Sequence, residues 1–329
     1  MALSLLVSAA AAVALGADGH PDLSGVWTNA SVTHLTRAPG IGKLVLNPAE
    51  AAAYEKNDGL VRRLDADSKQ SDPNAGAPAQ GDPGGYNTFW LDPGVKLGRV
   101  RGEVRTSWIV DPADGQLPLT DAGRTKVAQA REFSRRADTP ANPENLEPWD
   151  RCIISSRGSG GPGMLNNIYN SNYQILQTKD FVTIVVEMVH DARAIPVFPT
   201  KAAAQAGHLP AALHPWLGDS TAWWEGPTLV VETVDVNAEQ GRAGPIFLTP
   251  QGRVTERLTR ASKDQILYEF QVEDPTYYAR PWKAEMTLLS GPKQLYEYAC
   301  HEGNYALVGI LRATRKEEAE AKGGKSAGR

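Results

Sequence analysis

The sequence predicts a mainly β protein, built as an antiparallel barrel or a sandwich with a few helices in its N-terminal half. Runs rich in β-branched and aromatic residues follow one another closely in the second half, and short turns such as Thr178-Lys179-Asp180 separate several of them. Parallel strands need long crossovers, so this spacing indicates antiparallel pairing. The predicted strands cover residues 173–177, 181–190, 228–236, 253–259, 265–272, 283–289 and 294–300.

Several of these runs carry an acid, an Arg or a Tyr on both faces. In residues 296–302, Tyr298 and Glu302 share one face, and Glu297 and His301 share the other. A barrel with a partly polar lumen explains this pattern, because ligand cavities place a few polar groups among apolar ones. A sheet with one charged outer face explains it equally well.

The N-terminal half alternates short elements with long loops. Residues 47–64 read as a helix, with Asn47 as cap, Pro48 in the first turn and Glu50 completing a capping box. Other expected elements are a strand at 104–110 that ends in a turn at 111–115, a helix at 120–136, and loops at 65–85 and 139–149 with an aromatic patch at 86–90 between them. Residues 155–163 form a Ser/Gly loop, which we interpret as mobile and as a rim or lid.

The opening strand, residues 21–28, contains Gly25-Val26-Trp27. This motif resembles the Gly-x-Trp signature of the calycin barrels, lipocalins included. The resemblance implies that Trp27 closes the base of a barrel and that a late Arg packs over it, for which Arg312 is the candidate.

The first 17 residues are predicted to be a signal peptide, because an apolar and Ala-rich run precedes small residues at Ala14, Gly16 and Ala17. The run lacks a preceding Lys or Arg. We therefore expect a periplasmic or secreted protein with a soluble mature form and no membrane contact. Residues 18–314 would form one β-rich domain with helical and loop insertions at 47–150, followed by a disordered tail at 315–329.

Cys152 and Cys300 are the two cysteines of the chain, and an even pair in an exported protein predicts a disulfide. Two free thiols are the alternative. The formal charge of −4 and the absence of a basic stripe argue against nucleic acid as a partner. No nucleotide fingerprint or serine-hydrolase elbow occurs, so no organic cofactor is expected. A divalent metal at His190, His301, Glu187 and Glu302 has no support from residue spacing.

Residues 214–232 hold three tryptophans and two carboxylates before an apolar run. Residues 225–227 read as a turn between two strands, and Pro227 argues against the simplest two-residue type. Trp223 and Trp224 must point to opposite faces. All the tryptophans can be core, or Trp216 and Trp224 can form an aromatic wall beside Asp219 and Glu225 for a ring-shaped or sugar-like ligand.

Residues 187–193 form the most reactive cluster by residue type. His190 is a candidate proton-transfer group, since its unperturbed pKa lies near neutrality. Arg193 can bind an anionic group, with Asp191 as a further substrate contact, or it can pair with Asp191 or Glu187 in a structural ion-pair clamp. A second cluster surrounds Cys300, where a disulfide would brace His301 and Glu302.

Much of residues 86–312 resembles a large family of exported bacterial β-rich proteins. The shared blocks include Trp216-Leu217-Gly218-Asp219-Ser220, Trp224-Glu225-Gly226 and Glu256-Arg257-Leu258-Thr259-Arg260, together with residues 105–112, 173–175, 190–196 and 296–305. The resemblance implies export and a β-rich fold but no particular activity. Pro227 departs from the Asp or Asn expected after Gly226.

The sequence thus predicts an enzyme that uses acid–base chemistry, a lyase, isomerase or hydrolase, on a sugar-like or aromatic ligand in a barrel cavity. The expected catalytic residues are His190, His301, Asp219 and Glu225, and the expected substrate-binding residues are Tyr173, Asp191, Arg193, Trp216, Trp224, Tyr298 and Glu302. A lipocalin-like binding or carrier protein is the alternative. The sequence does not indicate an oligomeric state.

Overall fold

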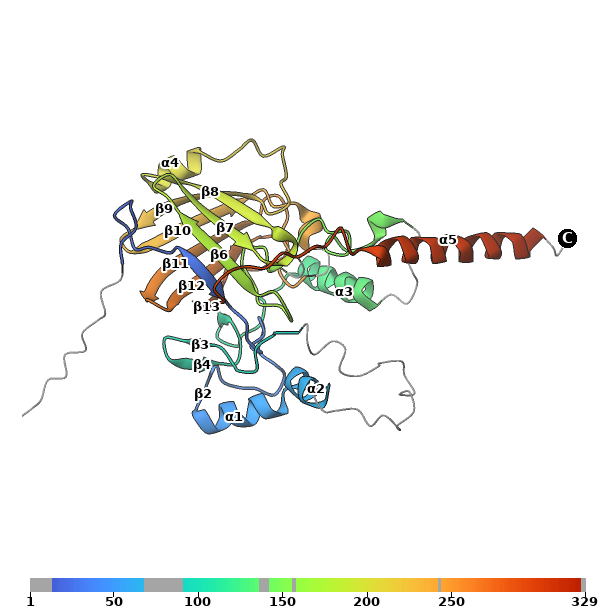
Figure 1. Cartoon of the computed structure of the whole chain (residues 1–329), viewed down its shortest axis with the longest axis horizontal. Coiled ribbons are helices and arrows are strands. Elements are labelled where there is room, and N and C mark those ends of the chain that lie inside the picture. The colour runs from blue at the N-terminus through green and yellow to red at the C-terminus, as the bar shows by residue number, and fades with distance from the viewer. Residues whose placement is uncertain (1–13, 68–90, 136–141, 156–157, 242–243, 327–329) are drawn as a thin grey trace, which may run out of the picture.

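The computed structural model describes residues 14–67, 91–135, 142–155, 158–241 and 244–326. Nine strands of this part close into a barrel, which confirms the mainly β prediction and selects the barrel over the sandwich (Figure 1). Their spatial order is β1-β6-β7-β8-β9-β10-β11-β12-β13, and β13 pairs back to β1. The strands are β1 (Gly25–Thr28), β6 (Asn172–Gln177), β7 (Phe181–Val186), β8 (Ala192–Phe198), β9 (Asp219–Glu225), β10 (Thr228–Val234), β11 (Arg253–Ser262), β12 (Gln265–Glu273) and β13 (Trp282–Ser290).

The barrel wall is antiparallel except between β8 and β9. These two strands run parallel and are paired only at Val197↔Ala222 and Phe198↔Trp223, near the end of β8. A parallel neighbour requires the chain to travel back along the barrel before the second strand begins. Residues 199–218 make this return and include helix α4 (Lys201–Ala206).

The barrel interior is filled by large side chains. In β12, the buried residues Ile266, Tyr268, Phe270 and Val272 alternate with more exposed ones, which are polar except for Leu267. Trp282 and Tyr173 are also fully buried and belong to the same core. The partly polar, ligand-holding lumen expected from the sequence is therefore replaced by a packed core that encloses a small polar network.

The tryptophan of the Gly-x-Trp motif is packed against an arginine, but not against the one expected from the sequence. Trp27 is buried in β1, and the guanidinium carbon of Arg260 lies 4.5 Å from the centre of its ring. Arg260 also donates to the backbone oxygens of Asp22, Ser262 and Lys263. The assignment of Arg312 was wrong, because that residue lies in a helix outside the barrel.

The turn after Glu225 contains only Gly226 and Pro227, since Glu225 pairs with Thr228. Gly226 has a φ of +57°. With Gly at the first turn position, Pro227 takes the second, where the ladder needs no N–H. The expectation that Pro227 excludes a two-residue turn was therefore wrong.

The N-terminal part forms a small layer beside the barrel. Helix α1 (Pro48–Asn57) begins with the predicted capping box of Asn47 and Glu50, and α2 (Gly59–Asp67) follows it. The predicted strand at 104–110 is two strands, β4 (Glu103–Arg105) in a three-stranded sheet and β5 (Ile109–Asp111) on the barrel edge beside β13. The small sheet also contains β2 (Val45–Leu46) and β3 (Arg99–Val100), and α3 (Asp121–Arg135) confirms the predicted helix.

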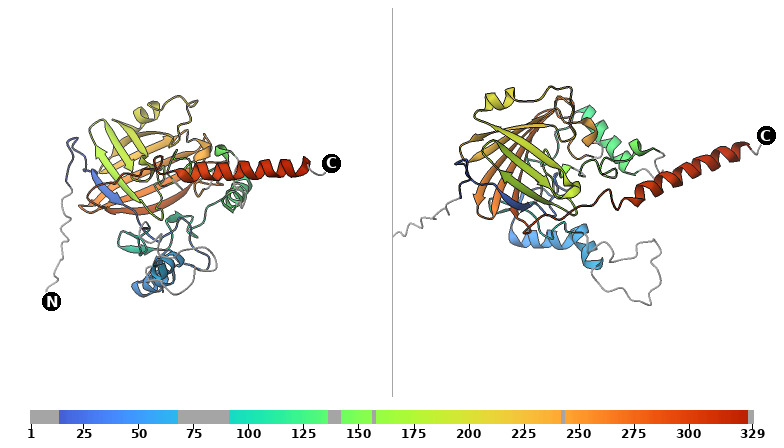
Figure 2. Two further views of the ribbon diagram at one scale, coloured as in Figure 1. Left: turned by 45° about the vertical axis from the view of Figure 1, so that its right-hand side comes forward. Right: turned by 45° about the horizontal axis from the view of Figure 1, so that its top comes forward.

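The chain after β13 differs from the sequence prediction. Residues 294–300 form no strand, and α5 (Tyr305–Ser326) occupies much of the predicted disordered tail. This helix projects away from the barrel (Figure 2). Short 3-10 turns occur at η1 (Pro143–Asn145), η3 (Met188–His190) and η4 (Ala238–Gly241). Among the described helices, none has the length and apolar character needed to cross a membrane.

Several expectations fall outside the described residues: most of the signal peptide, most of the 65–85 loop and the aromatic patch at 86–90. Residues 14–22 are described. They form a small loop in which Leu15 and Pro21 pair.

Candidate active site in the groove between β8 and β9

The divergence of β8 and β9 leaves a groove of about 630 Å³ in the barrel wall. The first halves of the two strands lack ladder pairing with each other, so side chains from both can line the space between them. The return segment supplies the outer wall, including Trp216. The lining comprises Ile153, Ile154, Val189, His190, Asp191, Ala192, Arg193, Ala194, Pro196, Gly207, Leu209, Pro215, Trp216, Leu217, Gly218, Asp219 and Ser220.

One end of the groove has an unusual backbone. Val189 and His190 have φ values of +61° and +56°. Such angles are sterically unfavourable for a β-branched residue, and surrounding contacts must hold them. Glu187 provides part of this support, since its carboxylate accepts from the Tyr296 backbone N–H at 3.0 Å and from Asn172 Nδ2 at 2.7 Å.

Asp191 is the groove carboxylate with a perturbed pKa. Its exposed fraction is 9%, and burial raises its pKa despite the hydrogen bond that Oδ2 accepts from the Ser155 backbone N–H at 2.6 Å. Gly160 packs tightly here, because a Cβ on it would lie 2.7 Å from Asp191 Oδ2. A carboxyl group that holds its proton above the usual range is suited to act as a general acid.

Asp219 lies on the other wall and is part of a second acid–base pair. Its Oδ2 lies 2.7 Å from His208 Nδ1 and also accepts from the Leu209 backbone N–H. His208 Nε2 lies 3.3 Å from Thr221 Oγ1 and 3.4 Å from Glu232 Oε1. A carboxylate on Nδ1 fixes the orientation of the ring.

Arg193 and Glu256 form an ion pair inside the barrel, at the inner side of the groove. Their side chains are 2% and 1% exposed. Burial opposes ionisation of both, but their mutual attraction and hydrogen bonds outweigh it, so the pKa of Glu256 is lowered and that of Arg193 is raised. Tyr268 Oη donates to Glu256 at 2.5 Å, and Arg193 Nη2 donates to Ser220 and Thr233. The charge of Arg193 is therefore already neutralised, which favours a structural clamp over a free anion-binding role. The partner is Glu256, however, and the expected pairing with Asp191 or Glu187 was wrong.

His190 is exposed, and its Nε2 accepts a hydrogen bond of 2.8 Å from the Tyr298 backbone N–H. An imidazole nitrogen that accepts a bond has its lone pair occupied, so the proton lies on Nδ1. In this arrangement His190 can donate a hydrogen bond to a ligand, but its Nε2 is not free to act as a base.

The groove brings together five of the predicted site residues, His190, Asp191, Arg193, Trp216 and Asp219. Other members of the predicted set lie elsewhere. Glu225 is on the outer face, where a hydrogen bond from Arg257 lowers its pKa. Tyr173 is fully buried, and Trp224 packs on the core and stacks on His20 with ring centres 4.4 Å apart.

Trp223, by contrast, faces outward and packs against Ala204 and Val230. Adjacent tryptophans thus point to opposite faces, as the strand geometry predicted.

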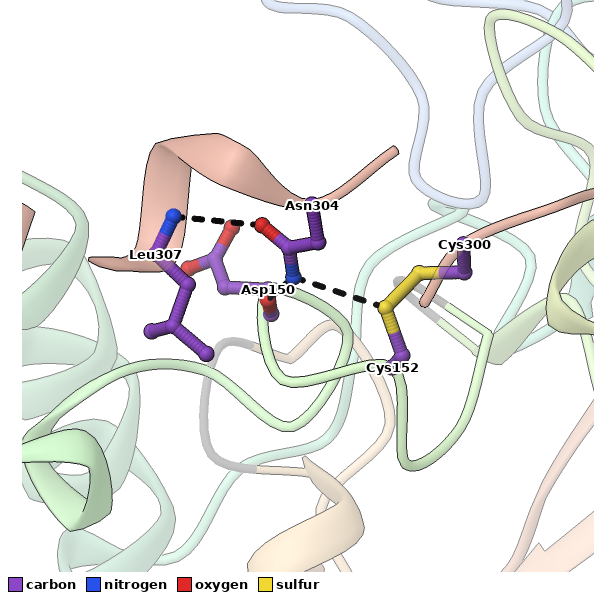
Figure 3. Close-up of a disulfide and its surroundings, with 5 residues drawn as sticks. All are labelled: Asp150, Cys152, Cys300, Asn304 and Leu307. Carbon is purple, nitrogen blue, oxygen red and sulfur yellow. Dashed lines mark hydrogen bonds between the residues drawn. A yellow bond between two sulfur atoms is a disulfide. The ribbon is translucent and has the colours of Figure 1, made fainter. Parts of the chain in front are cut away.

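The second predicted cluster is held outside the barrel by the disulfide. Cys152 and Cys300 are joined, as the sequence predicted, and Asn304 donates to Cys152 Sγ and to the Asp150 backbone oxygen (Figure 3). Asn304 also caps α5 by accepting from the Leu307 N–H (Figure 3). His301 and Glu302 are exposed beside this link and do not line the groove. The regions near 190 and 220 therefore share one groove. The region near 300 touches the first of them through the Tyr298 N–H, which donates to His190, but contributes no residue to the groove lining.

The described part of the Ser/Gly loop is packed rather than lid-like. Ser159 and Gly160 are buried, and the Gly163 N–H donates to Glu256 at 3.4 Å. A Cβ on Gly161 would lie 2.7 Å from Arg193 Nη1. The glycines allow the loop to approach the buried ion pair closely.

Sequence reasoning missed His208, Glu256 and Tyr268. An alternation count on β11 and β12 places Glu256 and Tyr268 on the same faces as Leu258 and Phe270, which signals an inward-facing acid and hydroxyl. His208 follows a short helix in a return segment whose path the sequence does not reveal.

Within the described residues, no group of three or more His, Cys, Asp or Glu side chains is arranged to hold a metal ion. Comparison with protein-family models, curated proteins and solved structures found no match to this chain.

Proposed function

We propose that this protein is an exported enzyme that performs acid–base chemistry on a neutral sugar-like or aromatic substrate bound in the β8–β9 groove. The observation that carries the proposal is the shared groove of Asp191, whose pKa is raised by burial, and Asp219, which is paired with His208. Two titratable sites in different environments can divide the acid and base roles. Trp216 supplies an aromatic surface on which a sugar or ring can pack.

In this mechanism Asp191 donates a proton to the substrate as general acid. Asp219 with His208 accepts a proton on the opposite wall, and His190 Nδ1 donates a hydrogen bond that orients the substrate. Arg193 acts as a positioning residue, because its bond to Ser220 and its pairing with Glu256 fix the inner side of the groove. A neutral substrate is favoured, since Arg193 has no uncompensated charge to offer.

Export is part of the proposal and draws support from the disulfide. Structural disulfides persist mainly in oxidising compartments. The periplasm or the extracellular space provides that condition.

The test screens p-nitrophenyl glycosides and p-nitrophenyl acetate for hydrolysis between pH 4 and 9 with wild type, Asp191→Asn and Asp219→Asn. We expect each groove variant to lose about 10²- to 10⁴-fold in kcat/KM, the usual contribution of a general acid or base. His301→Gln and Asp180→Asn, both exposed and outside the groove, serve as matched controls that retain activity.

A binding protein without chemistry is the second candidate, favoured by the occupied lone pair of His190. It is distinguished by tryptophan-labelled NMR with methyl glycosides and phenol. A shift of the Trp216 indole signal without turnover supports binding alone. If no turnover and no shift of the Trp216 signal are observed, both uses of the groove are ruled out for these compounds.

A further inference from the structure

Arg37 is a buried arginine whose guanidinium has no partner in the part of the chain that the structure describes. Its exposed fraction is 5%, and its side chain donates no hydrogen bond to a described residue. Nε and Nη2 are enclosed by protein, which leaves Nη1 as the nitrogen open to a ligand. The backbone is firmly held, because the Arg37 N–H donates to Gly115 O at 3.0 Å and its oxygen accepts from Gln116 Nε2 at 2.9 Å.

The other buried arginines of the described chain are paired with carboxylates. Arg193 pairs with Glu256, and Arg105 lies 2.9 Å from Glu103 and 3.3 Å from Glu285. Burying a cation costs substantial free energy unless a counter-charge and hydrogen bonds compensate it. Arg37 thus differs from Arg105 and Arg193 in having no carboxylate partner among the described residues.

Arg37 lines a groove of about 490 Å³, and no acidic residue is among its described lining residues. His34 is an exposed member of the lining and Thr36 a partly buried one, and both can donate hydrogen bonds. Leu35, Pro39 and Leu165 add apolar surface. This groove shares no lining residue with the β8–β9 groove.

The turn after β5 is built to pack on this arginine. Gly115 has a φ of +71°, and a Cβ on it would lie 2.9 Å from Arg37 Cβ and 3.1 Å from Nε. Any side chain there would displace Arg37, so the glycine lets the turn cover one edge of the guanidinium. The open Nη1 is thereby presented on the other side.

We propose that this groove is a second binding site, one that takes the oxyanion of a small organic molecule, a carboxylate or a phosphate. Arg37 Nη1 binds the oxyanion by a charge-assisted hydrogen bond, His34 and Thr36 add donors, and the apolar wall contacts the organic body. The site is independent of the chemistry in the β8–β9 groove.

The experiment titrates the full chain with sodium phosphate and, separately, with sodium benzoate by isothermal calorimetry, at an ionic strength held constant with chloride. Binding of phosphate alone identifies a phosphate ligand, and binding of benzoate alone a carboxylate. Binding of both identifies a general oxyanion site. Absence of binding by both anions would overturn the proposal.

Arg37→Gln is expected to weaken binding by about 10- to 100-fold, the value of a hydrogen bond to a charged group. Without ligand, this variant should unfold at an equal or higher temperature than wild type, because it removes an unpaired buried charge. Arg99→Gln removes an exposed charge outside the groove and is the matched control. Equal binding by Arg37→Gln and wild type would contradict the assignment. If Arg37→Gln does not fold, His34→Gln tests the same site, with several-fold weaker binding expected and unchanged binding counting against it.

Discussion

Replacing Glu256 by Gln tests whether the buried ion pair between Arg193 and Glu256 contributes more to the free energy of unfolding than an ordinary surface pair does. The substitution keeps the shape of the side chain but leaves Arg193 charged, 2% exposed and without its counter-ion. Removing one partner of a buried pair typically costs about 3–5 kcal/mol, because the remaining charge is uncompensated. We expect a loss of that size in the free energy of unfolding, measured by urea denaturation with fluorescence detection.

The chain contains a matched control for this experiment. Glu225→Gln breaks the ion pair between Glu225 and Arg257, in which the two side chains are 43% and 39% exposed, respectively. A surface pair of this kind contributes about 0–1 kcal/mol to stability. The double variant Arg193→Met/Glu256→Gln should recover much of the loss, since neither charge remains. Similar small losses for Glu256→Gln and Glu225→Gln, with no recovery in the double variant, would refute the view that the barrel interior excludes water around this pair.

Three further predictions concern other parts of the molecule. Burial raises the folded-state pKa of Asp191, so the stability of the protein should fall as the pH rises from about 4 through that pKa. Asp191→Asn should remove this slope from a plot of melting temperature against pH. An unchanged slope in the variant would count against the assignment to Asp191. Cys152→Ser removes the disulfide, which links positions 148 residues apart, and it should lower the free energy of unfolding by up to about 4–5 kcal/mol in urea titrations without reductant. Equal stability of variant and wild type would show that the disulfide adds no stability. Arg260→Met removes the stacking on Trp27 and three hydrogen bonds to backbone oxygens, and it should lower the free energy of unfolding by about 1–3 kcal/mol in thermal denaturation. Arg312→Met should leave the stability nearly unchanged. A larger loss for Arg312→Met than for Arg260→Met would favour Arg312 as the arginine that packs on Trp27.

The sequence predicts the barrel well where local patterns decide the structure. The alternation in β11 to β13, the capping box at Asn47 and the cysteine pair all follow from residue type and spacing. Among the residues assigned to sites from the sequence, only the disulfide follows from such a local pattern, because the chain has only two cysteines that can pair. Residues 294–300 mislead, because their alternation resembles a strand, although the N–H groups of Tyr296 and Tyr298 bond to the side chains of Glu187 and His190 instead of to a neighbouring strand.

The candidate site is harder to predict because it depends on long-range geometry. Asp219 and Glu225 share one face of β9, yet Asp219 lies at the end where β8 diverges, and Glu225 lies at the opposite hairpin. Residue type cannot reveal that difference. Nor can it show that Arg193 points inward to an acid 63 positions away.

The return segment between β8 and β9 has a consequence for how the protein can diversify. Residues 199–218 contribute Gly207, Leu209, Pro215, Trp216, Leu217 and Gly218 to the groove, while the strands of the barrel keep their own ladders. Exchanging this segment would reshape the outer wall of the groove with little change to the pairing of the scaffold. Under the proposed function, most of this wall and the strand ladders lie in separate stretches of the chain, which makes residues 209–217 a suitable region for randomised libraries that leave His208 and Gly218 unchanged.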